Sequence, residues 1–247
     1  MAKLNKTDAV AVGICLDESL SMASCLEPTI KGFNDFIKKM GKQKGATTVT
    51  LTQFSSPGVE PNFRVAFKAR KIEKVPKLST ENYMPRGNTP LFDAIGATIT
   101  ALDAELKEHG KDPPRAFVVI QTDGEENDSR DYTREQIVKM IEKREKKGWT
   151  FVFLGANMSD ERAAGVAGPM GVTGATGYEG VRSNDAFVAV ASAASGVRLS
   201  GATGATMDSF TASNLIKAAY DEMGDDEDKD DIHAKINRRA ATTPLSK

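Results

Sequence analysis

A carboxylate and two hydroxyls lie at alternate positions in the segment Asp17-Glu18-Ser19-Leu20-Ser21. They follow an apolar run, residues 9–16, that is typical of a buried strand, and they precede a long amphipathic segment. In an open α/β sheet, ligands bind where the carboxyl end of a strand leads into a helix. Oxygen ligands suit a hard cation such as Mg²⁺, which takes few protein carboxylates and keeps several waters. Asp17, Ser19 and Ser21 are therefore candidate metal ligands.

Two later loops offer further oxygen ligands in the same structural setting. Residues 86–91 have the sequence Arg-Gly-Asn-Thr-Pro-Leu, precede a second amphipathic segment and contribute Thr89. Residues 121–125 have the sequence Gln-Thr-Asp-Gly-Glu, follow a second apolar run at residues 116–120 and contribute Asp123. Because strand ends and helix starts of this kind lie at one edge of a parallel sheet, we expect the side chains of all three segments to lie together.

The three segments resemble the metal-ion-dependent adhesion site of von Willebrand factor A domains. That pattern is Asp-x-Ser-x-Ser, then a threonine in a loop like Gly-Asn-Thr-Pro-Leu, then an aspartate in a loop like Thr-Asp-Gly, and all three parts occur here in order. The resemblance covers residues 8–200 approximately. It implies that Ser19, Ser21 and Thr89 are hydroxyl ligands and that Asp17 and Asp123 bind the metal directly or through water. It also implies one open coordination position, which an Asp or Glu of a protein partner can fill.

Each candidate ligand also has an ordinary structural explanation. Ser19 or Ser21 could cap the first helix, and Thr89 followed by Pro90 has the form of a helix N-cap. The two aspartates could be loop residues. We favour metal binding because five such residues occur in the order that the family shows. The expected ion is Mg²⁺, with Mn²⁺ or Ca²⁺ as alternatives.

Three neighbouring residues are candidates for contact with a partner. Many relatives carry glycine where this sequence has Leu20, so an apolar side chain could lie at the rim of the site. Alternatively, this leucine packs inward against Pro90 or Leu91. Arg86 and Asn88 flank the threonine and could orient an acidic partner, or they could be solvated loop residues.

The segments that must position these residues alternate between strand and helix patterns. Apolar residues at spacings of three and four predict a helix that ends near Gly41 and another that follows Pro90. Residues 47–54 and 62–67 are predicted strands joined by a short loop, which favours an antiparallel pair. A capping box at residues 133–136 predicts a third helix, and a strand at residues 149–154 follows it.

This order of elements predicts an α/β fold, a Rossmann-like open sheet that is mostly parallel with helices on both faces. The resemblance implies six strands with one antiparallel edge strand, and a short last strand near Val172 would complete them. We expect helix caps at Ser159, at Ser183 and at Asp208 or Ser209. Glycine recurs at every third residue in 171–180, but this run is too short and too poor in proline for a collagen-like helix. We interpret it as a flexible loop around an edge strand.

Composition restricts the class of protein and its partners. The 247 residues are 40% hydrophobic and 27% charged with a net charge of −1, which argues against electrostatic binding to nucleic acid or to a membrane surface. No apolar run approaches the ~20 residues of a membrane helix, and no apolar segment near the N-terminus indicates a secretory signal. Cys15 lies in the first predicted strand, so a reduced core thiol is expected. We therefore expect a cytoplasmic protein, in the host cytoplasm if the chain is viral.

We expect two regions in the chain, a von Willebrand factor A domain over residues 1–222 and a charged tail over residues 223–247. Aspartate and glutamate dominate residues 221–231, which is typical of a solvated tail. The tail could also contact a partner or fold back through its own opposite charges.

The leading functional hypothesis is a non-enzymatic, Mg²⁺-dependent interaction module that binds an acidic residue of a protein partner. The loops and lengths look most like intracellular von Willebrand factor A proteins of bacteria and bacteriophages. A structural or assembly component of a phage or bacterial complex, with an incidental metal, is the alternative. The sequence does not identify the partner, and it leaves the oligomeric state open.

A metal-dependent hydrolase is a third hypothesis. Asp17 at a strand end suits an aspartyl nucleophile, but a phosphatase of the haloacid dehalogenase type would have a second aspartate where this chain has Ser19. No histidine or lysine is placed as a general acid or base, since His109 and His233 are isolated in the sequence. We therefore do not expect an enzyme.

Overall fold

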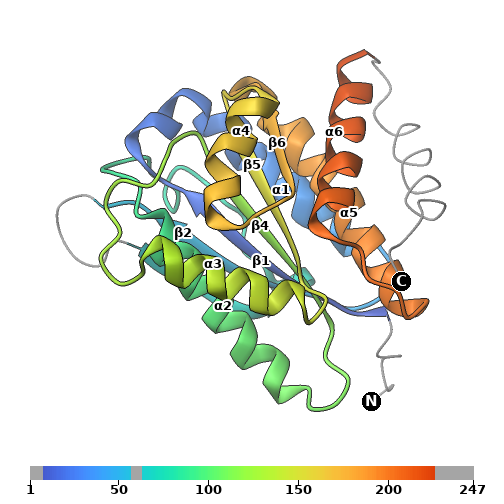
Figure 1. The fold of residues 1–247 in the computed structure, drawn as a ribbon. Helices are drawn as coiled ribbons and strands as arrows, with labels where there is room; N and C mark the ends of the chain where they lie inside the picture. Colours follow the sequence, from blue (N-terminus) through green and yellow to red (C-terminus); the bar gives the residue numbers. More distant parts are fainter. Residues whose placement is uncertain (1–7, 57–62, 226–247) are drawn as a thin grey trace.

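A six-stranded sheet forms the centre of the computed structural model, which describes residues 8–56 and 63–225 (Figure 1). The strand order is β3-β2-β1-β4-β5-β6, and within the described residues only β3 runs antiparallel to its neighbour. This confirms the predicted mostly parallel sheet with one antiparallel edge strand. The strands are β1 (Val10–Asp17), β2 (Thr47–Phe54), β3 (Phe63–Lys71), β4 (Arg115–Thr122), β5 (Thr150–Ala156) and β6 (Ala175–Tyr178).

Helices cover both faces of the sheet (Figure 1). One face packs its apolar residues against α1, α5 and α6, and the other packs against α2, α3 and α4. The helices are α1 (Leu26–Lys42), α2 (Leu91–Glu108), α3 (Arg134–Glu145), α4 (Asp160–Ala167), α5 (Ser183–Ala202) and α6 (Ser209–Asp225). Short 3₁₀ turns lie at η2 (Leu20–Cys25), η3 (Ile72–Lys74), η4 (Gly168–Met170) and η5 (Gly180–Arg182).

The predicted apolar stripes of the first two helices are confirmed. Phe33 and Met40 of α1 are buried on one face of the sheet, and Ile95, Ile99 and Leu102 of α2 are buried on the other. β1 is buried along its whole length because it lies between β2 and β4. Both cysteines are buried free thiols. In the described part of the chain, no helix combines the length and the apolar character needed to cross a membrane.

The predicted caps are confirmed in part. Ser159 caps α4, and Asp208 accepts a hydrogen bond from the Thr211 N–H at the start of α6. The capping box that opens α3 is present. The prediction for Ser183 was wrong, because this serine is already the first residue of α5 and its hydroxyl donates to the Gly180 carbonyl at 2.7 Å.

The interpretation of Thr89 as a helix cap was also wrong. Pro90 occupies the N-cap position of α2 and makes no side-chain cap hydrogen bond. The Thr89 backbone is engaged elsewhere: its N–H donates to Asn127 Oδ1 at 2.8 Å, and its carbonyl accepts from the Asn127 N–H at 3.2 Å. This arrangement leaves the threonine hydroxyl available for another role.

The glycine-rich segment is a packed edge of the sheet, which corrects its interpretation as a flexible loop. β6 begins at Ala175, three residues beyond the Val172 at which a last strand was expected. A β-carbon at Gly174 would lie 2.1 Å from the Ser209 carbonyl oxygen, and one at Gly177 would lie 2.3 Å from the Met158 carbonyl oxygen. Glycine is therefore required because the backbone of β6 approaches neighbouring backbone closely.

Two predictions fall largely outside the described residues. The loop between the predicted strands of residues 47–54 and 62–67 lies in the undescribed range 57–62, and most of the predicted tail lies in 226–247. The division of the chain at residues 222 and 223 stays a prediction.

Candidate functional site

The three polar segments singled out in the sequence meet at the carboxyl edge of the sheet. Asp17 ends β1, and Asp123 directly follows β4, the strand beside it. The Ser21 hydroxyl donates a hydrogen bond to Asp123 Oδ1 at 2.6 Å, and the Ser19 and Ser21 hydroxyl oxygens lie 3.2 Å apart. The structure therefore brings the first and third segments into direct contact.

Thr89 joins this group from the second segment. A β-carbon placed on Gly124 would lie 3.6 Å from Thr89 Oγ1, so the threonine hydroxyl faces the residue that follows Asp123. Thr89 is buried, whereas Ser21 is exposed. The five predicted ligands thus form one cluster that opens to solvent at Ser21.

Asp17 lies at the buried end of the cluster. Its carboxylate accepts hydrogen bonds from the Ser19 N–H at 2.7 Å and from the Thr122 hydroxyl, and its carbonyl accepts from the Tyr83 hydroxyl at 2.6 Å. Burial raises the pKa of the Asp17 carboxyl to about 7, while the hydrogen bonds from Thr122 and Ser19 act in the opposite direction. A divalent cation beside the carboxylate would favour its ionised form, because an opposite charge lowers a carboxyl pKa.

The donor set suits an oxygen-binding cation. Adjacent ligands of an octahedral Mg²⁺ lie about 2.9 Å apart, given metal–oxygen distances of ~2.0–2.1 Å. The separations of Ser19 from Ser21 and of Ser21 from Asp123, 3.2 and 2.6 Å, lie on either side of that value. No three His, Cys, Asp or Glu side chains are grouped as metal ligands in residues 8–56 and 63–225, so a cation here would depend on hydroxyl ligands.

A set of side chains that the sequence analysis missed holds the Thr89 loop in place. Asn127 binds both backbone groups of Thr89, as described above. The Glu126 carboxylate accepts from the Phe92 N–H at 2.9 Å, in the first turn of α2, and also from the Ser129 N–H and hydroxyl. The loop after β4 and the start of α2 are therefore held as one unit.

Asp93 anchors the far end of the same loop. This buried carboxylate accepts three backbone N–H groups, those of Arg130, Asp131 and Tyr132, each at 2.9 Å. An acidic residue among the apolar positions of α2 was a signal that could have revealed this anchor. Buried carboxylates are retained where several donors satisfy them.

Glu18 connects the first segment to the Thr89 loop. Its carboxylate accepts from the Met84 N–H at 2.5 Å and lies 3.5 Å from the Arg64 guanidinium, and burial raises its pKa. Its carbonyl accepts from the Arg86 N–H at 2.8 Å. The Leu20 N–H donates to the Gly87 carbonyl at 3.1 Å. These bonds fix the second segment against the end of β1.

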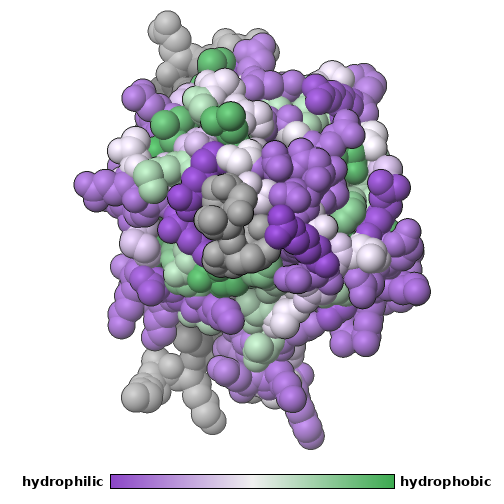
Figure 2. All heavy atoms as spheres, turned by 90° about the vertical axis from the view of Figure 1, so that its left-hand side faces the viewer, coloured by the Kyte–Doolittle hydropathy of each residue, from purple (hydrophilic) through white to green (hydrophobic). Residues whose placement is uncertain are grey.

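The three predicted contact residues lie on the exposed rim of the cluster. Leu20 is 64% exposed, so it does not pack inward against the buried Pro90 and Leu91. Arg86 and Asn88 are exposed, although the Asn88 backbone pairs with Ser56. Figure 2 views the molecule from the left-hand side of Figure 1 and shows apolar spots scattered among hydrophilic residues on that side.

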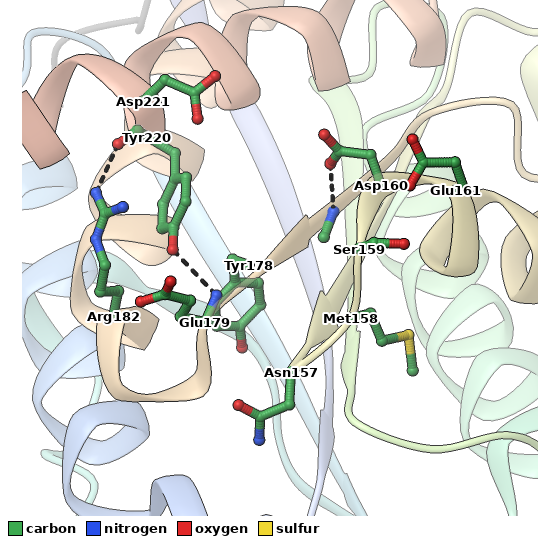
Figure 3. Close-up of a pocket in the computed structure, with 11 residues that line it drawn as sticks. Asn157, Met158, Ser159, Asp160, Glu161, Tyr178, Glu179, Arg182, Tyr220 and Asp221 are labelled. Atoms are coloured by element: carbon green, nitrogen blue, oxygen red, sulfur yellow. Dashed lines mark hydrogen bonds between the residues drawn. The ribbon is translucent and has the colours of Figure 1, made fainter.

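An open cleft of about 650 Å³ lies at the ends of β5 and β6, and no sequence argument predicted it. Figure 3 shows Asp160, Glu179 and Asp221 lining it together with the stacked pair of Arg182 and Tyr220. Asp160 accepts the Gly177 N–H at 2.8 Å, and the Arg182 guanidinium donates to the Tyr220 carbonyl at 2.8 Å. The first bond attaches α4 to β6, and the second attaches α6 to η5.

Comparison with protein families matches residues 12–166 to the von Willebrand factor type A domain. Comparison with curated proteins finds no match. Among solved structures, a von Willebrand factor type A protein from Catenulispora acidiphila is similar, with 12% identity over 76% of this chain and a TM-score of 0.55. The PilB minor pilin from Streptococcus sanguinis matches 99% of this chain with 12% identity and a TM-score of 0.51. This chain covers 43% and 64% of those two proteins. At this identity the likenesses show the fold.

Proposed function

Because the chain belongs to the von Willebrand factor type A family, we propose that it is a protein-interaction module that binds a divalent cation and, through it, an acidic residue of a partner. The expected ion is Mg²⁺, with Mn²⁺ or Ca²⁺ as alternatives. Asp17, Ser19, Ser21, Thr89 and Asp123 would hold it. The bound ion would supply a positive charge that attracts a carboxylate of the partner.

The observation that carries this proposal is the contact of Ser21 with Asp123 beside Ser19, at the solvent-facing end of a buried carboxylate site. Two carboxylates and three neutral hydroxyls supply at most five of the six positions of an octahedral Mg²⁺, so one position is open to water or to a carboxylate of the partner. The start of the first helical segment lies at the same edge, where backbone N–H groups favour an anion.

The intracellular, non-enzymatic character of the protein belongs to the same proposal. We propose a cytoplasmic protein of the bacterial or bacteriophage type, because the loops and lengths of the three segments look most like those of such family members. The described hydrogen bonds use the polar groups around Asp17 to hold loops. Neither histidine of the sequence belongs to the three segments of the site. This favours binding over hydrolysis.

Affinity capture with the immobilised protein tests the proposal. We expect a partner to bind the wild-type chain in Mg²⁺, and to be lost in EDTA and with Asp123→Ala. Glu125→Ala is the matched control, because Glu125 is exposed two residues away and is not a predicted ligand. A partner held equally in EDTA and by Asp123→Ala would contradict the metal bridge and would favour a structural or assembly role.

A further inference from the structure

Two β-bulges in the edge strand β3 change which of its side chains share a face. The pairing with β2 joins Gln53 to Arg64, Leu51 to Phe67 and Val49 to Arg70, with a register shift between successive pairs. Each shift adds one residue on β3, so residues three apart point the same way. Because alternate residues of β2 share one face, Arg64, Phe67 and Arg70 lie together on the face that carries α1.

These residues line a groove of about 410 Å³ between β3 and residues 76–82. Leu51 and Phe67 are buried in the core beneath it, and the Arg70 guanidinium lies over the Phe67 ring at 5.1 Å. Arg64 and Lys77 are exposed at its sides. The groove therefore has an apolar floor with cations along its rim.

The far wall of the groove is firmly held. Asn34 of α1 exchanges two hydrogen bonds of 2.9 Å with the Leu78 backbone. Asn82 accepts the Ser79 N–H at 2.8 Å and donates to the Lys77 carbonyl at 3.1 Å. Such a wall is formed before any ligand binds, which reduces the entropic cost of binding.

Charge is concentrated on this side of a nearly neutral protein. Residues 63–77 contain six lysines or arginines and one glutamate, whereas the whole chain has a net charge of −1. Lysine on an edge strand is also an ordinary guard against edge-to-edge pairing. That role explains charges along the strand edge, but it does not explain a cation-lined groove on the face of the sheet.

We propose that this groove binds an extended, acidic segment of a partner protein, with carboxylates at the arginines and apolar side chains along the apolar floor of the groove. Arg64 and Arg70 pair with Gln53 and Val49, which are four residues apart on β2, so an extended segment of about four residues, at ~3.3 Å per residue, spans both. The two bulges and the positive φ of Ala69, 47°, disfavour addition of a strand to the edge. Recognition is therefore through side chains.

Nucleic acid fits the groove less well. Single strands stack their bases on exposed aromatic rings, whereas Phe67 is 8% exposed and lies beneath Arg70. The apolar floor suits a protein segment in which acidic and apolar residues alternate. The inference rests on the proposed function only in taking the partner to be a protein. The groove lies close to the candidate metal cluster, because the Arg64 guanidinium is 3.5 Å from the Glu18 carboxylate.

Fluorescence anisotropy with a labelled peptide, three repeats of Glu-Leu-Glu-Ser, tests the groove. At an ionic strength of about 0.05 M, we expect the wild-type protein to bind this peptide. The double variant Arg70→Glu with Lys77→Glu should bind it about tenfold or more weakly. Arg70→Lys retains binding. The control is the double variant Lys107→Glu with Lys111→Glu. Both lysines are exposed, one in the last turn of α2 and the other three residues beyond its end, and this variant binds as wild type.

The same measurement is repeated in EDTA and with the Ser21→Ala variant. Two other ligands are also measured, the Lys-Leu-Lys-Ser repeat peptide and a single-stranded DNA of twelve nucleotides. Loss of binding in Arg70→Glu and Lys77→Glu that persists in EDTA supports the groove. Equal binding of the acidic peptide by the two double variants overturns the proposal. DNA binding that is tighter than peptide binding and that depends on the groove overturns it too. A Mg²⁺ effect that Ser21→Ala removes reports on the metal cluster alone, so failure of the metal site and failure of the groove are distinguishable.

Discussion

The Ser21 hydroxyl donates a 2.6 Å hydrogen bond to Asp123, although 102 residues separate the two in the chain. This bond joins the loop after β1 to the loop after β4. The first and third parts of the sequence pattern are therefore in direct contact. A cation at this point would replace a hydrogen bond between two of its own ligands, so the cluster is preorganised for binding.

We predict that Mg²⁺ raises the melting temperature of the wild-type chain and not that of Ser21→Ala. A ligand at 100 times its Kd stabilises the folded state by about 2.7 kcal/mol. For a chain of this size that is roughly 5–10 °C. Thermal unfolding with Mg²⁺ and with EDTA measures the difference.

Ser24→Ala is the matched control for this measurement. Ser24 is exposed on the same 3₁₀ turn as Ser21, and its hydroxyl donates to the Ser21 carbonyl at 3.2 Å. It is not a predicted ligand, so its variant should retain the full Mg²⁺ effect. An equal loss of the effect in both variants would point to the turn and not to the ligand.

We predict that Asn127 positions Thr89. Asn127→Ala removes the 2.8 Å hydrogen bond from the Thr89 N–H, and we expect it to weaken Mg²⁺ binding about 10–100-fold, as losses of such supporting bonds do in metal sites. Asn127→Asp keeps an oxygen acceptor and should retain most of the affinity. Isothermal titration calorimetry gives both values.

The stability of the same variants separates positioning from folding. Loss of one hydrogen bond costs about 1 kcal/mol, so Asn127→Ala in EDTA should melt only roughly 2–4 °C below wild type. A large loss of stability with unchanged Mg²⁺ affinity in the remaining folded protein would show that Asn127 supports the fold and not the site.

The sequence predicted the parts of this fold that depend on apolar patterning and local turns. The first five strands, the inward stripes of α1 and α2, and the capping box that opens α3 follow from local patterning. The last strand, β6, was expected only from the family resemblance and at Val172. The cluster of Asp17, Ser19, Ser21, Thr89 and Asp123 was predictable because strand ends meet at one edge of a parallel sheet.

Long-range backbone contacts were not predictable from the sequence. Thr89 resembles a helix cap locally, but Asn127, 38 residues away, takes its backbone N–H. A period of two along β3 places Phe67 and Arg70 on opposite faces, whereas the bulge between them places them on the same one. In both cases residues distant in the sequence determine the local conformation, and the local spacing of residue types does not indicate it.

We predict that the folded domain extends past residue 222. Met223 of α6 lies just beyond the expected domain boundary and is buried in the core, and α6 ends at Asp225. A chain ending at residue 225 keeps the whole of α6 and is the reference. A chain ending at residue 222 loses the burial of Met223, worth about 1.5–3 kcal/mol, and should melt roughly 3–12 °C lower.

Met223→Ala in the full-length chain isolates the contribution of this side chain. It should lower the melting temperature in the same direction as the shorter truncation, because both remove the same apolar contact. If the chain ending at residue 222 and the chain ending at residue 225 melt together, the boundary expected from the sequence is correct.

Glu105 leads to a prediction about pH. This α2 residue is 5% exposed, its Oε1 accepts from the Thr48 hydroxyl, and its Oε2 has no hydrogen-bond partner in the described structure. Burial raises the pKa of the Glu105 carboxyl, and the Thr48 hydrogen bond acts against that shift. A carboxyl whose folded pKa lies above its unfolded pKa destabilises the fold once the pH exceeds the unfolded value.

Glu105→Gln should therefore stabilise the protein at pH 7 and have little effect near pH 3, about one unit below the ordinary glutamate pKa, where the wild-type carboxyl is protonated in both states. The gain should be on the order of 1 kcal/mol, because the amide keeps the Thr48 bond and carries no charge into the core. Thermal melts across this pH range measure it, with the exposed Glu108→Gln as the control. A gain that is equal at both pH values would mean that the ionised Glu105 is already accommodated, and that packing accounts for the change.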